Sequence, residues 1–513
     1  MLLVCLVVGS NSYAAPDRRA ERARIAPEYN DLQQKIVERQ AIPVIVRFKV
    51  DKPDGRSQAI RREAGRQRLK NAMAPKNIRP FAEYRRSGLS AYFVNAAQLD
   101  ALIDSGLVDA VRESKPRKAH LQQSNDLVDS QTARNYGFNG NGAVTVILDT
   151  GIDAAHSTFD NRVVWEACFS TNWAQYSATN LCPAGGNNNA TQYFQSGPGA
   201  AAPTKCTDVP CWHGTHVAAI AAGSNTTYTG MAPEAGIIAI QVFSRFSSPI
   251  YCGIGNAPCI LSFDHDQLSA LEYVADLTAS YNIASVNMSL GGGNYSAACD
   301  GSSNFTDAID ALESLGIIVA ASSGNDYYTS AMGHPACLSK VVSVGSVLDT
   351  SDTVSSFSNS ASFLDVLAPG QPITAGYPGG GYATASGTSM AAPHVAGALA
   401  VMKSFDSTLT YAEMKSLLID NGDPVLDTRN GLTFPRLNLG AISLALFETV
   451  AGDANDDGKL DAADLLLLQR HLTGAITLDP SAVSRCDVHP TGNPNGLLGA
   501  SDLVRLEQML LAP

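Results

Sequence analysis

Three polar residues stand where apolar segments of the chain begin or end. Asp149 follows the apolar run 143–148, His213 opens an apolar helical pattern, and Ser389 comes shortly before the apolar run 395–402. An aspartate at a strand end can orient an imidazole. A serine in the first turn of a helix lies beside backbone N–H groups that have no helical partner. Together the three residues could supply an orienting carboxylate, a general base and a nucleophile for acyl transfer.

A fourth residue, Asn325, follows the apolar run 317–321. Its side-chain amide could donate a hydrogen bond to the oxyanion that acyl transfer creates. A serine before a helix is more commonly an N-cap, so Ser389 taken alone would predict no chemistry. The combination of four matching residue types at element boundaries favours the catalytic interpretation.

Three other chemistries fit the residues less well. Asp149-Thr150-Gly151 is typical of aspartic proteases, but that reaction needs two such carboxylates, and a second Asp-Thr-Gly is absent unless the chain dimerises. His213 and His216 could bind a metal ion, but no acidic or cysteine ligand supports them at helical spacing. Ser389 also lacks the Gly-x-Ser-x-Gly context of α/β-hydrolases.

Three segments resemble the signatures of the subtilisin-like serine proteases, in the order Asp, His, Ser that this family uses. They are 149–153 (DTGID), 213–217 (HGTHV) and 387–394 (GTSMAAPH). The resemblance covers residues 130 to 445 and implies a secreted serine endopeptidase that works through an acyl-enzyme and is made as a self-processed zymogen.

The same resemblance assigns roles to individual residues. It implies a catalytic triad of Asp149, His213 and Ser389, with Asn325 in the oxyanion hole. It also implies that one wall of the substrate cleft pairs with an extended peptide. The residues of that wall are Ser289, Leu290, Gly291 and Gly292.

The elements that must position these residues follow an alternating pattern. Short apolar runs without strict alternation are typical of a parallel sheet that is covered on both faces. These runs are 143–148, 236–242, 284–288 and 316–320, and helical periodicity is found at 264–281 and 306–315. The pattern predicts an α/β, subtilisin-like three-layer domain with a mainly parallel sheet over residues 122–448, with catalytic groups at strand ends.

The segment 16–121 has a different pattern, strand–helix–strand–strand–helix–strand, which is the ferredoxin-like α+β order. The expected strands are 42–50, 78–84, 89–95 and 107–112, and the expected helices are 57–74 and 97–104. In pattern and position this segment resembles the inhibitory propeptides of the family. Residues 113–130 read as a linker, and we expect autocleavage between Ser114 and Ser130.

Charge divides the chain in the same place. Residues 16–121 hold 23 Lys or Arg against 13 Asp or Glu, a net charge of +10, whereas the rest holds 13 basic and 35 acidic residues, a net charge of −22. A basic block often indicates nucleic-acid binding. Here the acidic remainder of the same chain is a sufficient partner, so no nucleic acid is expected.

The N-terminus and the cysteines both indicate export. Residues 1–15 are apolar and end in small residues, as in a signal peptide of a secreted bacterial protein, and no later stretch is apolar enough to predict a membrane span. Eight cysteines lie between residues 168 and 337 without a metal-binding spacing. Close spacing favours the pairs 206–211 and 252–259, leaving 168–182 and 299–337, although spacing alone does not fix the connectivity.

The last segment, 449–513, has the oxygen-ligand spacing of an EF-hand calcium loop. Positions 1, 3, 5, 9 and 12 are held by Asp453, Asn455, Asp457, Asp461 and Asp464, with Gly458 at position 6 and Lys459 at position 7. The final aspartate makes the segment resemble a dockerin module: small, helical and calcium-binding. This implies a cohesin-like partner and no organic cofactor. A plain turn between two helices is the alternative.

A second copy of this loop, running from Asn493 to Asp502, is degenerate, because it lacks an aspartate at Thr491 and because Asp487 could serve it only across an insertion. The alternative from another class is a binding protein whose tail recruits the chain to a scaffold, with the protease-like domain as a stalk. An intact triad disfavours that alternative.

Overall fold

The computed structural model describes residues 22–506 except 23, 51–57, 85–86, 115, 120–126, 136, 186–191, 226–227, 451, 456–459, 479, 489–497, 500 and 505. The chain divides into two compact units, residues 1–114 and 115–513, and each is described by itself. The signal-peptide prediction for residues 1–15 lies outside the described residues.

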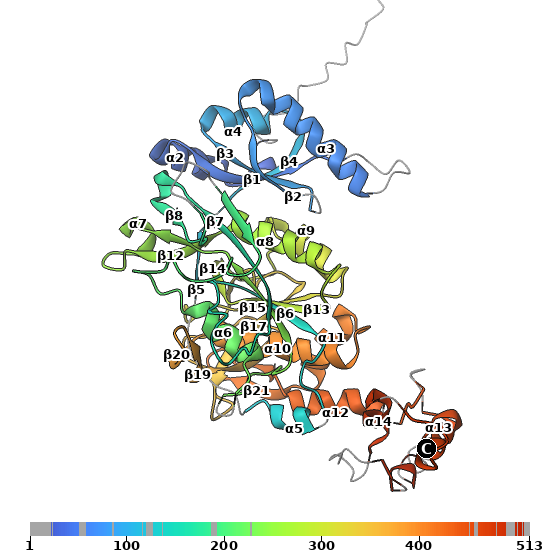
Figure 1. Ribbon diagram of the computed structural model, residues 1–513. Coiled ribbons are helices and arrows are strands. Elements are labelled where there is room, and N and C mark those ends of the chain that lie inside the picture. Colours follow the sequence, from blue (N-terminus) through green and yellow to red (C-terminus); the bar gives the residue numbers. More distant parts are fainter. Residues whose placement is uncertain are drawn as a thin grey trace, which may run out of the picture. The chain divides into compact units, whose positions relative to one another are not determined.

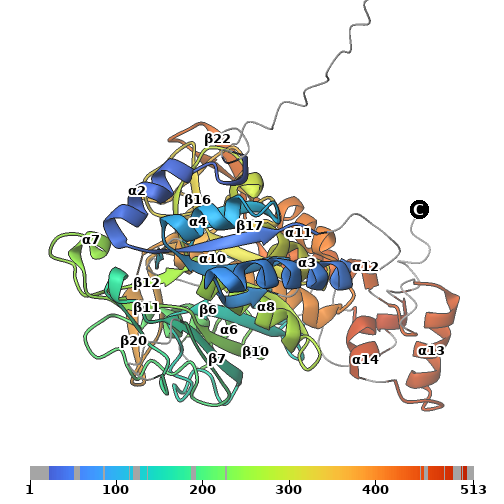
Figure 2. The ribbon, with the colours of Figure 1, turned by 90° about the horizontal axis from the view of Figure 1, so that it is seen from above.

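The first unit has the predicted order of elements, preceded by an additional helix, α2 (Tyr29–Arg39). The elements are β1 (Ile42–Phe48), α3 (Gln58–Met73), the 3-10 turn η1 (Ala74–Lys76), β2 (Pro80–Tyr84), β3 (Leu89–Val94), α4 (Ala96–Ile103) and β4 (Val108–Glu113). The strands form an antiparallel sheet in the order β2-β3-β1-β4, and α3 and α4 cover one face of it (Figures 1 and 2).

Helix α4 shows how the local sequence specifies this unit. Asn95 caps the helix by accepting a hydrogen bond from the Gln98 N–H, and the Gln98 side chain accepts one from the Asn95 N–H. Both exchanges satisfy backbone donors that a helix start leaves open. The cap fixes the face of α4 that carries Leu99 and Leu102 into the core against Val46 of β1.

The second unit is built on a ten-stranded sheet, counted over its described residues, in the order β21-β22-β18-β17-β15-β13-β6-β10-β7-β9. Neighbours from β22 to β7 are parallel, while β21 and β9 pair antiparallel at the edges. In chain order the strands are β6 (Val144–Asp149), β7 (Val163–Thr171), β9 (Gln192–Ser196), β10 (Gly236–Gln241), β13 (Ile283–Met288), β15 (Ile318–Ser322), β17 (Val341–Leu348), β18 (Val366–Gln371), β21 (Asp423–Asp427) and β22 (Leu432–Arg436).

Helices cover both faces of this sheet, which confirms the predicted three-layer α/β domain. Figure 1 shows α8 (Asp264–Leu277) and α9 (Thr306–Glu313) on one side of β6 and β13, with α6 (His213–Ala222) and α10 (Thr388–Phe405) on the other. The remaining helices and 3-10 turns of this domain are α5 (Ser130–Asn135), η2 (Ala174–Tyr176), α7 (Pro249–Cys252), η3 (Asp300–Ser302), α11 (Tyr411–Asp420) and α12 (Leu439–Val450).

A second, antiparallel sheet has the order β16-β14-β5-β12-β11-β8. Its strands are β5 (Pro116–Ala119), β8 (Ala178–Asn180), β11 (Ser244–Phe246), β12 (Cys259–Phe263), β14 (Leu290–Tyr295) and β16 (Met332–His334); β19 (Ile373–Tyr377) and β20 (Gly381–Ala385) form a separate hairpin. The prediction of a linker over residues 113–130 was wrong at β5. This segment is a strand because its backbone pairs with strands far away in the sequence.

Four disulfide bonds join the cysteines in the favoured pairs. They are Cys168–Cys182, Cys206–Cys211, Cys252–Cys259 and Cys299–Cys337. Their presence supports an oxidising compartment. Among the described helices, none has the length and apolar character needed to cross a membrane.

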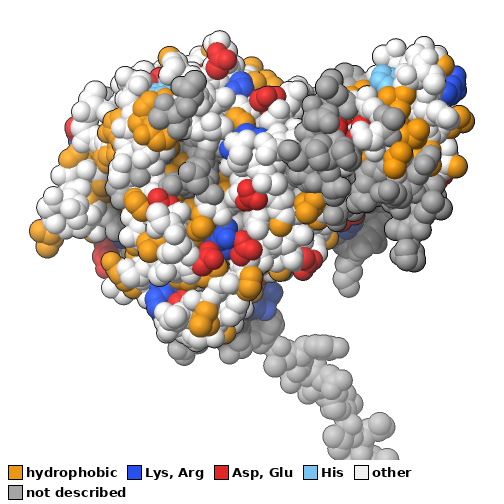
Figure 3. Space-filling view, turned by 90° about the horizontal axis from the view of Figure 1, so that it is seen from below, with side chains coloured by type: hydrophobic (Ala, Val, Ile, Leu, Met, Phe, Trp, Pro, Cys, Tyr) orange, Lys and Arg blue, Asp and Glu red, His pale blue; other side chains and the backbone are white. Residues whose placement is uncertain are grey.

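The C-terminal segment contains α13 (Ala462–Leu472) and α14 (Pro480–Cys486), which lie side by side in two views (Figures 1 and 2). Leu466 and Val504 are 54% and 51% exposed. Hydrophobic side chains gather on the surface of this segment in the space-filling view (Figure 3).

Candidate active site

Three neighbouring parallel strands bring candidate residues to one edge of the sheet. β6 ends at Asp149, β13 is followed directly by Ser289, and β15 ends shortly before Asn325. These strands are adjacent in the order β15-β13-β6. Because parallel strands end at the same edge, residues far apart in sequence converge there.

Asp149 and His213 are in contact at this edge. Asp149 Oδ1 lies 2.7 Å from His213 Nδ1, and both side chains are buried. The Thr150 N–H donates to the same carboxylate oxygen at 2.7 Å. Two hydrogen bonds to one oxygen fix the carboxylate, which in turn selects the His213 tautomer that carries its proton on Nδ1.

Thr150 also ties the end of β6 to the start of α6. Its hydroxyl donates to the Cys211 carbonyl at 3.0 Å and accepts from the Gly214 N–H at 2.9 Å. A Cβ atom on Gly214 would lie 2.1 Å from the Gly151 carbonyl oxygen, so glycine is needed for this close approach. The helix that carries His213 is thereby held against the strand that carries Asp149.

Ser389 lies in the first turn of α10, which packs against α6. Its side chain is fully buried, and its hydroxyl donates to the Ser289 carbonyl at 3.2 Å. The nucleophile candidate therefore lies at the end of β13, where the chain continues as β14.

Asn325 is positioned through Thr388, the residue before Ser389. Asn325 Oδ1 accepts hydrogen bonds from the Thr388 N–H at 2.9 Å and from the Thr388 hydroxyl at 3.0 Å. With its oxygen held by both donors, the side chain keeps its NH₂ group directed away from Thr388. Sequence reasoning missed Thr150 and Thr388; their place beside Asp149 and Ser389 was the signal that could have identified them.

The wall predicted at residues 289–292 lies beside a strand of the chain itself. Strand β5 runs antiparallel to β14 with Ala119 opposite Leu290 and Lys118 opposite Gly291, while Gly292 is opposite His334 on β16. On its other side β5 pairs with β12, with Arg117 opposite Ser262 and Pro116 opposite Phe263. An extended segment thus lies between two strands beside Ser389.

Two other histidines of the motifs, His216 and His394, are buried and lie against backbone carbonyls. His216 Nε2 lies 3.1 Å from the Ala383 carbonyl oxygen, and burial lowers the His216 pKa to about 3. His394 Nδ1 lies 2.7 Å from the Met390 carbonyl oxygen. Both rings thus lie against backbone carbonyls, whereas His213 is the histidine that contacts Asp149.

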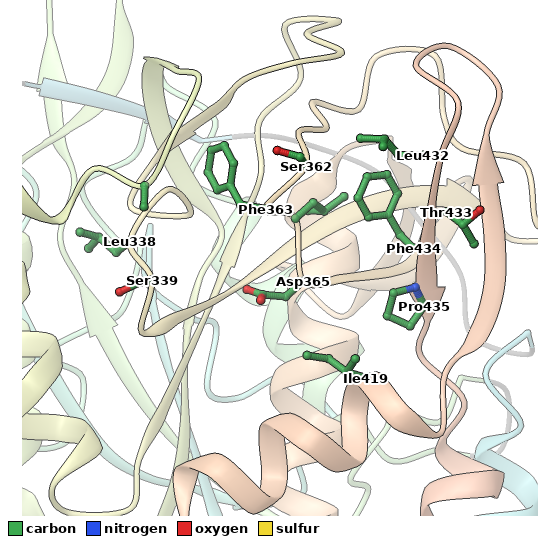
Figure 4. Close-up of a pocket in the computed structure, with 12 residues that line it drawn as sticks. Leu338, Ser339, Ser362, Phe363, Asp365, Ile419, Leu432, Thr433, Phe434 and Pro435 are labelled. Carbon is green, nitrogen blue, oxygen red and sulfur yellow. The ribbon is translucent and has the colours of Figure 1, made fainter.

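A separate pocket of about 440 Å³ lies elsewhere in the second unit. Figure 4 shows Phe363, Ile419 and Phe434 around it, with Asp365 beside them. Its lining contains none of the predicted site residues. Asp365 is bound by the Ser343 hydroxyl and by Lys415, so its carboxylate serves the fold.

The C-terminal segment repeats one hydrogen-bonding arrangement twice. Asp464 Oδ1 accepts from the Ala454 N–H at 2.9 Å and Asp464 Oδ2 accepts from the Asp461 N–H at 2.8 Å. Asp502 Oδ1 likewise accepts from the Val488 N–H at 3.0 Å and Asp502 Oδ2 from the Gly499 N–H at 2.8 Å.

Asp464 follows its donor Ala454 by ten residues in the first copy, whereas Asp502 follows its donor Val488 by fourteen in the second. The same pair of hydrogen bonds to an aspartate at the start of a helix thus recurs in both copies despite the insertion. Asp453, Asp464, Asp487 and Asp502 are all buried.

Not every predicted calcium ligand can be placed. Asp457 and Lys459 lie outside the described residues, as do Asn493, Asn495 and Gly496 of the second copy. Asp461 caps helix α13 through a hydrogen bond from the Ala463 N–H at 2.7 Å. Within the described part of the chain, no group of three or more His, Cys, Asp or Glu residues is arranged to hold a metal ion.

Residues 140–438 match the Subtilase family, peptidase S8, and residues 451–511 match the Dockerin type I domain. The chain therefore belongs to the subtilase family and carries a dockerin type I domain, which confirms both resemblances. Subtilisin E of Bacillus subtilis (strain 168) is 31% identical over 287 residues, covering 55% of this chain and 61% of that protein. Subtilisin of Bacillus pumilus has the same identity and is covered over 84% of its length.

Alkaline serine exoprotease A of Vibrio alginolyticus is 29% identical over 339 residues, covering 66% of this chain and 51% of that protein. The chain thus spans about three fifths of the length of the subtilisin E sequence. A solved structure described as a cold adapted subtilisin-like serine proteinase is 28% identical, with 58% of this chain and 89% of that chain covered at a TM-score of 0.43.

Proposed function

We propose that this chain is a secreted serine endopeptidase that is made as a self-processing zymogen. The observation that carries the proposal is the buried contact of 2.7 Å between Asp149 and His213, at the sheet edge where Ser389 begins the neighbouring helix. Membership of the subtilase family and the names of the relatives support the same activity. The four disulfides support secretion.

In the proposed reaction, the Ser389 hydroxyl leaves the Ser289 carbonyl and attacks the scissile carbonyl carbon while His213 Nε2 takes its proton. Asp149 stabilises the imidazolium that forms, and the Asn325 NH₂ group donates to the oxyanion. Collapse of the tetrahedral intermediate breaks the C–N bond, and the leaving amine takes the proton from His213. Water then attacks the acyl-enzyme through the same steps of proton transfer to His213 and collapse, and this hydrolysis releases Ser389.

The substrate is an extended peptide, because the strands on both sides of β5 offer backbone partners to any extended segment. Backbone pairing with β12 and β14 would give affinity that is independent of sequence. The residues Ser289, Leu290, Gly291 and Gly292 form the wall on the β14 side of this segment.

Strand β5 also suggests where the chain cuts itself. Ala119, the last residue of β5, lies opposite Leu290, and the residue before Leu290 is Ser289, whose carbonyl accepts a hydrogen bond from the Ser389 hydroxyl. Residues 120–126 lie outside the described residues. We therefore propose that the processed bond lies after Ala119 and before Ser130, within the expected interval 114–130. Segment 16–121, of opposite net charge to the rest, is then the inhibitory propeptide.

A fluorophosphonate probe and a protein substrate test this proposal on the full chain. The wild-type protein is expected to be labelled at Ser389 and to hydrolyse the substrate, and Ser389→Ala is expected to do neither. A folded wild-type protein that is not labelled would support the binding-protein alternative. N-terminal sequencing of the mature protein is expected to show a start between residues 120 and 130, and a start near Pro16 would contradict self-processing.

We further propose that the dockerin domain binds calcium in both loops. Buried carboxylates at equivalent positions, Asp453 with Asp464 and Asp487 with Asp502, are the hard oxygen donors that Ca²⁺ prefers. The residues present therefore fit the ion, which would cross-link each loop to the start of its helix. In full-length Ser389→Ala protein, calcium titration is expected to show two sites. Asp464→Ala and Asp502→Ala are each expected to remove one, and an unchanged stoichiometry would contradict the assignment.

A cohesin-like partner is proposed for the same domain. Leu466 follows Asp464 by two residues and Val504 follows Asp502 by two, so the repeat presents two equivalent exposed apolar side chains. The double variant Leu466→Lys/Val504→Lys is expected to lose binding to a purified cohesin domain in calcium. The matched change at exposed Leu426, outside this domain, is expected to have no effect on that binding.

A further inference from the structure

Asn359 lies in the connection between β17 and β18, and its side chain is fully buried against the loop that carries Asn325. Its Oδ1 accepts hydrogen bonds from the N–H groups of Asp326 at 2.8 Å and Tyr328 at 3.1 Å. Its Nδ2 donates to the Ser323 carbonyl at 3.2 Å and to Asp326 Oδ2 at the same distance. One amide side chain therefore binds the loop both before and after Asn325.

The backbone of Asn359 holds the same loop. Its N–H donates to the Gly324 carbonyl at 2.8 Å, and its carbonyl accepts from the Ser323 hydroxyl at 2.8 Å. The next residue, Ser360, donates its N–H to the Tyr328 carbonyl at 2.8 Å. The connection between β17 and β18 thus encloses Asn325 on both sides.

These bonds maintain a loop conformation that is costly by itself. Gly324 has φ +111°, and Tyr327 adopts φ +63° although it is not glycine. A bulky residue such as Tyr327 rarely adopts the left-handed region, because its Cβ atom crowds the backbone there. A Cβ atom on Gly324 would lie 2.3 Å from Asn359 Nδ2, so the asparagine side chain fills the space that a side chain there would need. Such a conformation persists only where its surroundings impose it.

We propose that Asn359 is a positioning residue for the oxyanion donor. Thr388 fixes which way the Asn325 amide faces, and Asn359 fixes the backbone from which that amide extends. Both are needed because an oxyanion donor must lie within about 2.7–3.1 Å of the developing charge. This inference rests on the proposed function and assigns to the chain a residue that acts only through Asn325.

The first test compares kcat and KM of the full chain for a peptide substrate, with concentrations set by active-site titration. Asn359→Ala is expected to lower kcat about 10-fold to 100-fold and to change KM less than about 2-fold, because misplacing the donor weakens only the transition state. Asn359→Asp, which keeps the two acceptor contacts but turns an acceptor oxygen toward the Ser323 carbonyl and the Asp326 carboxylate, is expected to lose at least as much. Asn438→Ala, another hydrogen-bonded asparagine of the same unit, is the matched control and is expected to leave kcat unchanged.

A double-mutant cycle with Asn325→Ala separates positioning from general destabilisation. If Asn359 acts through Asn325, its replacement in the Asn325→Ala background is expected to cost less than about 2-fold in kcat. Affinity for a peptide aldehyde, whose adduct with Ser389 carries the oxyanion, is expected to fall by the same factor as kcat. The proposal would be overturned if the losses in kcat from the two single variants simply added up in the double variant, or if Asn359→Ala changed KM instead of kcat.

If Asn359→Ala fails to fold, Asn359→Ser takes its place in the same cycle, with thermal unfolding as the check. An inactive but folded wild-type protein would overturn the proposed function itself. An active wild-type protein with an additive cycle would overturn only the role of Asn359.

Discussion

Ser289 and Ser389 exchange two hydrogen bonds in opposite directions. The Ser289 hydroxyl donates to the Ser389 carbonyl at 2.6 Å, and the Ser389 hydroxyl donates to the Ser289 carbonyl at 3.2 Å. The first of these bonds replaces one that α10 cannot make. Pro393 has no N–H, so the Ser389 carbonyl four residues earlier lacks its helical donor. The helix continues through Pro393 because a hydroxyl from the end of β13 takes the place of that donor.

We therefore predict that Ser289→Ala destabilises the protein by about 1–3 kcal/mol, because the Ser389 carbonyl and the Asn287 amide each lose a buried partner. In a Pro393→Ala background, where an N–H is restored, the same change is expected to cost less. Thermal unfolding of the four proteins measures this coupling. Equal costs in both backgrounds would contradict the explanation.

Asn325→Ala is expected to lower kcat by about 10²–10³ with little change in KM. The size is taken over from subtilisin, where the loss of one oxyanion donor has this effect. Steady-state kinetics with a peptide substrate measure it. Thr388→Val, which removes one of the two hydrogen bonds to Asn325 Oδ1, is expected to lose less activity, and a larger loss than for Asn325→Ala would contradict the assigned geometry.

The buried carboxyl group of Asp266 is expected to make the stability of the fold depend on pH. Burial raises its pKa from 3.8 to about 7, against smaller opposing effects of hydrogen bonds from Gln192 and Thr171. The folded state therefore holds the proton more tightly than the unfolded state. The contribution of Asp266 to stability is full below about pH 4, is lost as the pH rises to about 7, and stays lost above it.

Replacing Asp266 with Asn should therefore stabilise the fold at pH 8, by on the order of a few kcal/mol, and leave it nearly unchanged at pH 4. Neighbouring His265, whose pKa burial lowers to about 3, has the opposite dependence in both proteins. The measured quantity is thus the difference in stability between the Asp266→Asn protein and its parent, both carrying Ser389→Ala. Thermal unfolding at each pH gives this difference. A difference that does not change with pH would disprove the prediction.

The disulfides are expected to contribute unequally. Cys299–Cys337 spans 38 residues and encloses the Asn325 loop, whereas Cys206–Cys211 spans five and lies just before His213. Loop-closure entropy predicts losses of about 4 and 2 kcal/mol when each pair is replaced by serine. Denaturant unfolding of the two double variants checks this order. The reverse order would show that native-state strain outweighs chain entropy.

The sequence revealed the residues whose types carry chemistry, because they stand at the ends of strongly apolar elements. Asp149, His213, Ser389 and Asn325 were predicted as site residues in this way, and the parallel sheet was predicted from runs without alternation. The supporting residues could not be identified. Thr388 and Asn359 act through side-chain hydrogen bonds to loops, and such bonds leave no periodic pattern in a sequence.

Strand β5 was missed for a related reason. Its sequence, Pro116 to Ala119, has neither the alternation nor the β-branched residues of a strand, and its partners on β12 and β14 lie more than 140 residues away. The correspondence of Asp487 with Asp453, each directly before the backbone donor of a recurring hydrogen bond, was hidden by an insertion that changes the spacing in the sequence.

The place of β5 between β12 and β14 has a kinetic consequence. A segment tethered to its own protease domain meets the nucleophile at an effective concentration fixed by the chain, whatever the number of molecules in solution. Maturation should then follow first-order kinetics with a rate that dilution does not alter. Under the proposed function, cleavage of another protein begins only after that strand has left, so the rate at which β5 leaves would set the moment at which the molecule becomes able to act on others.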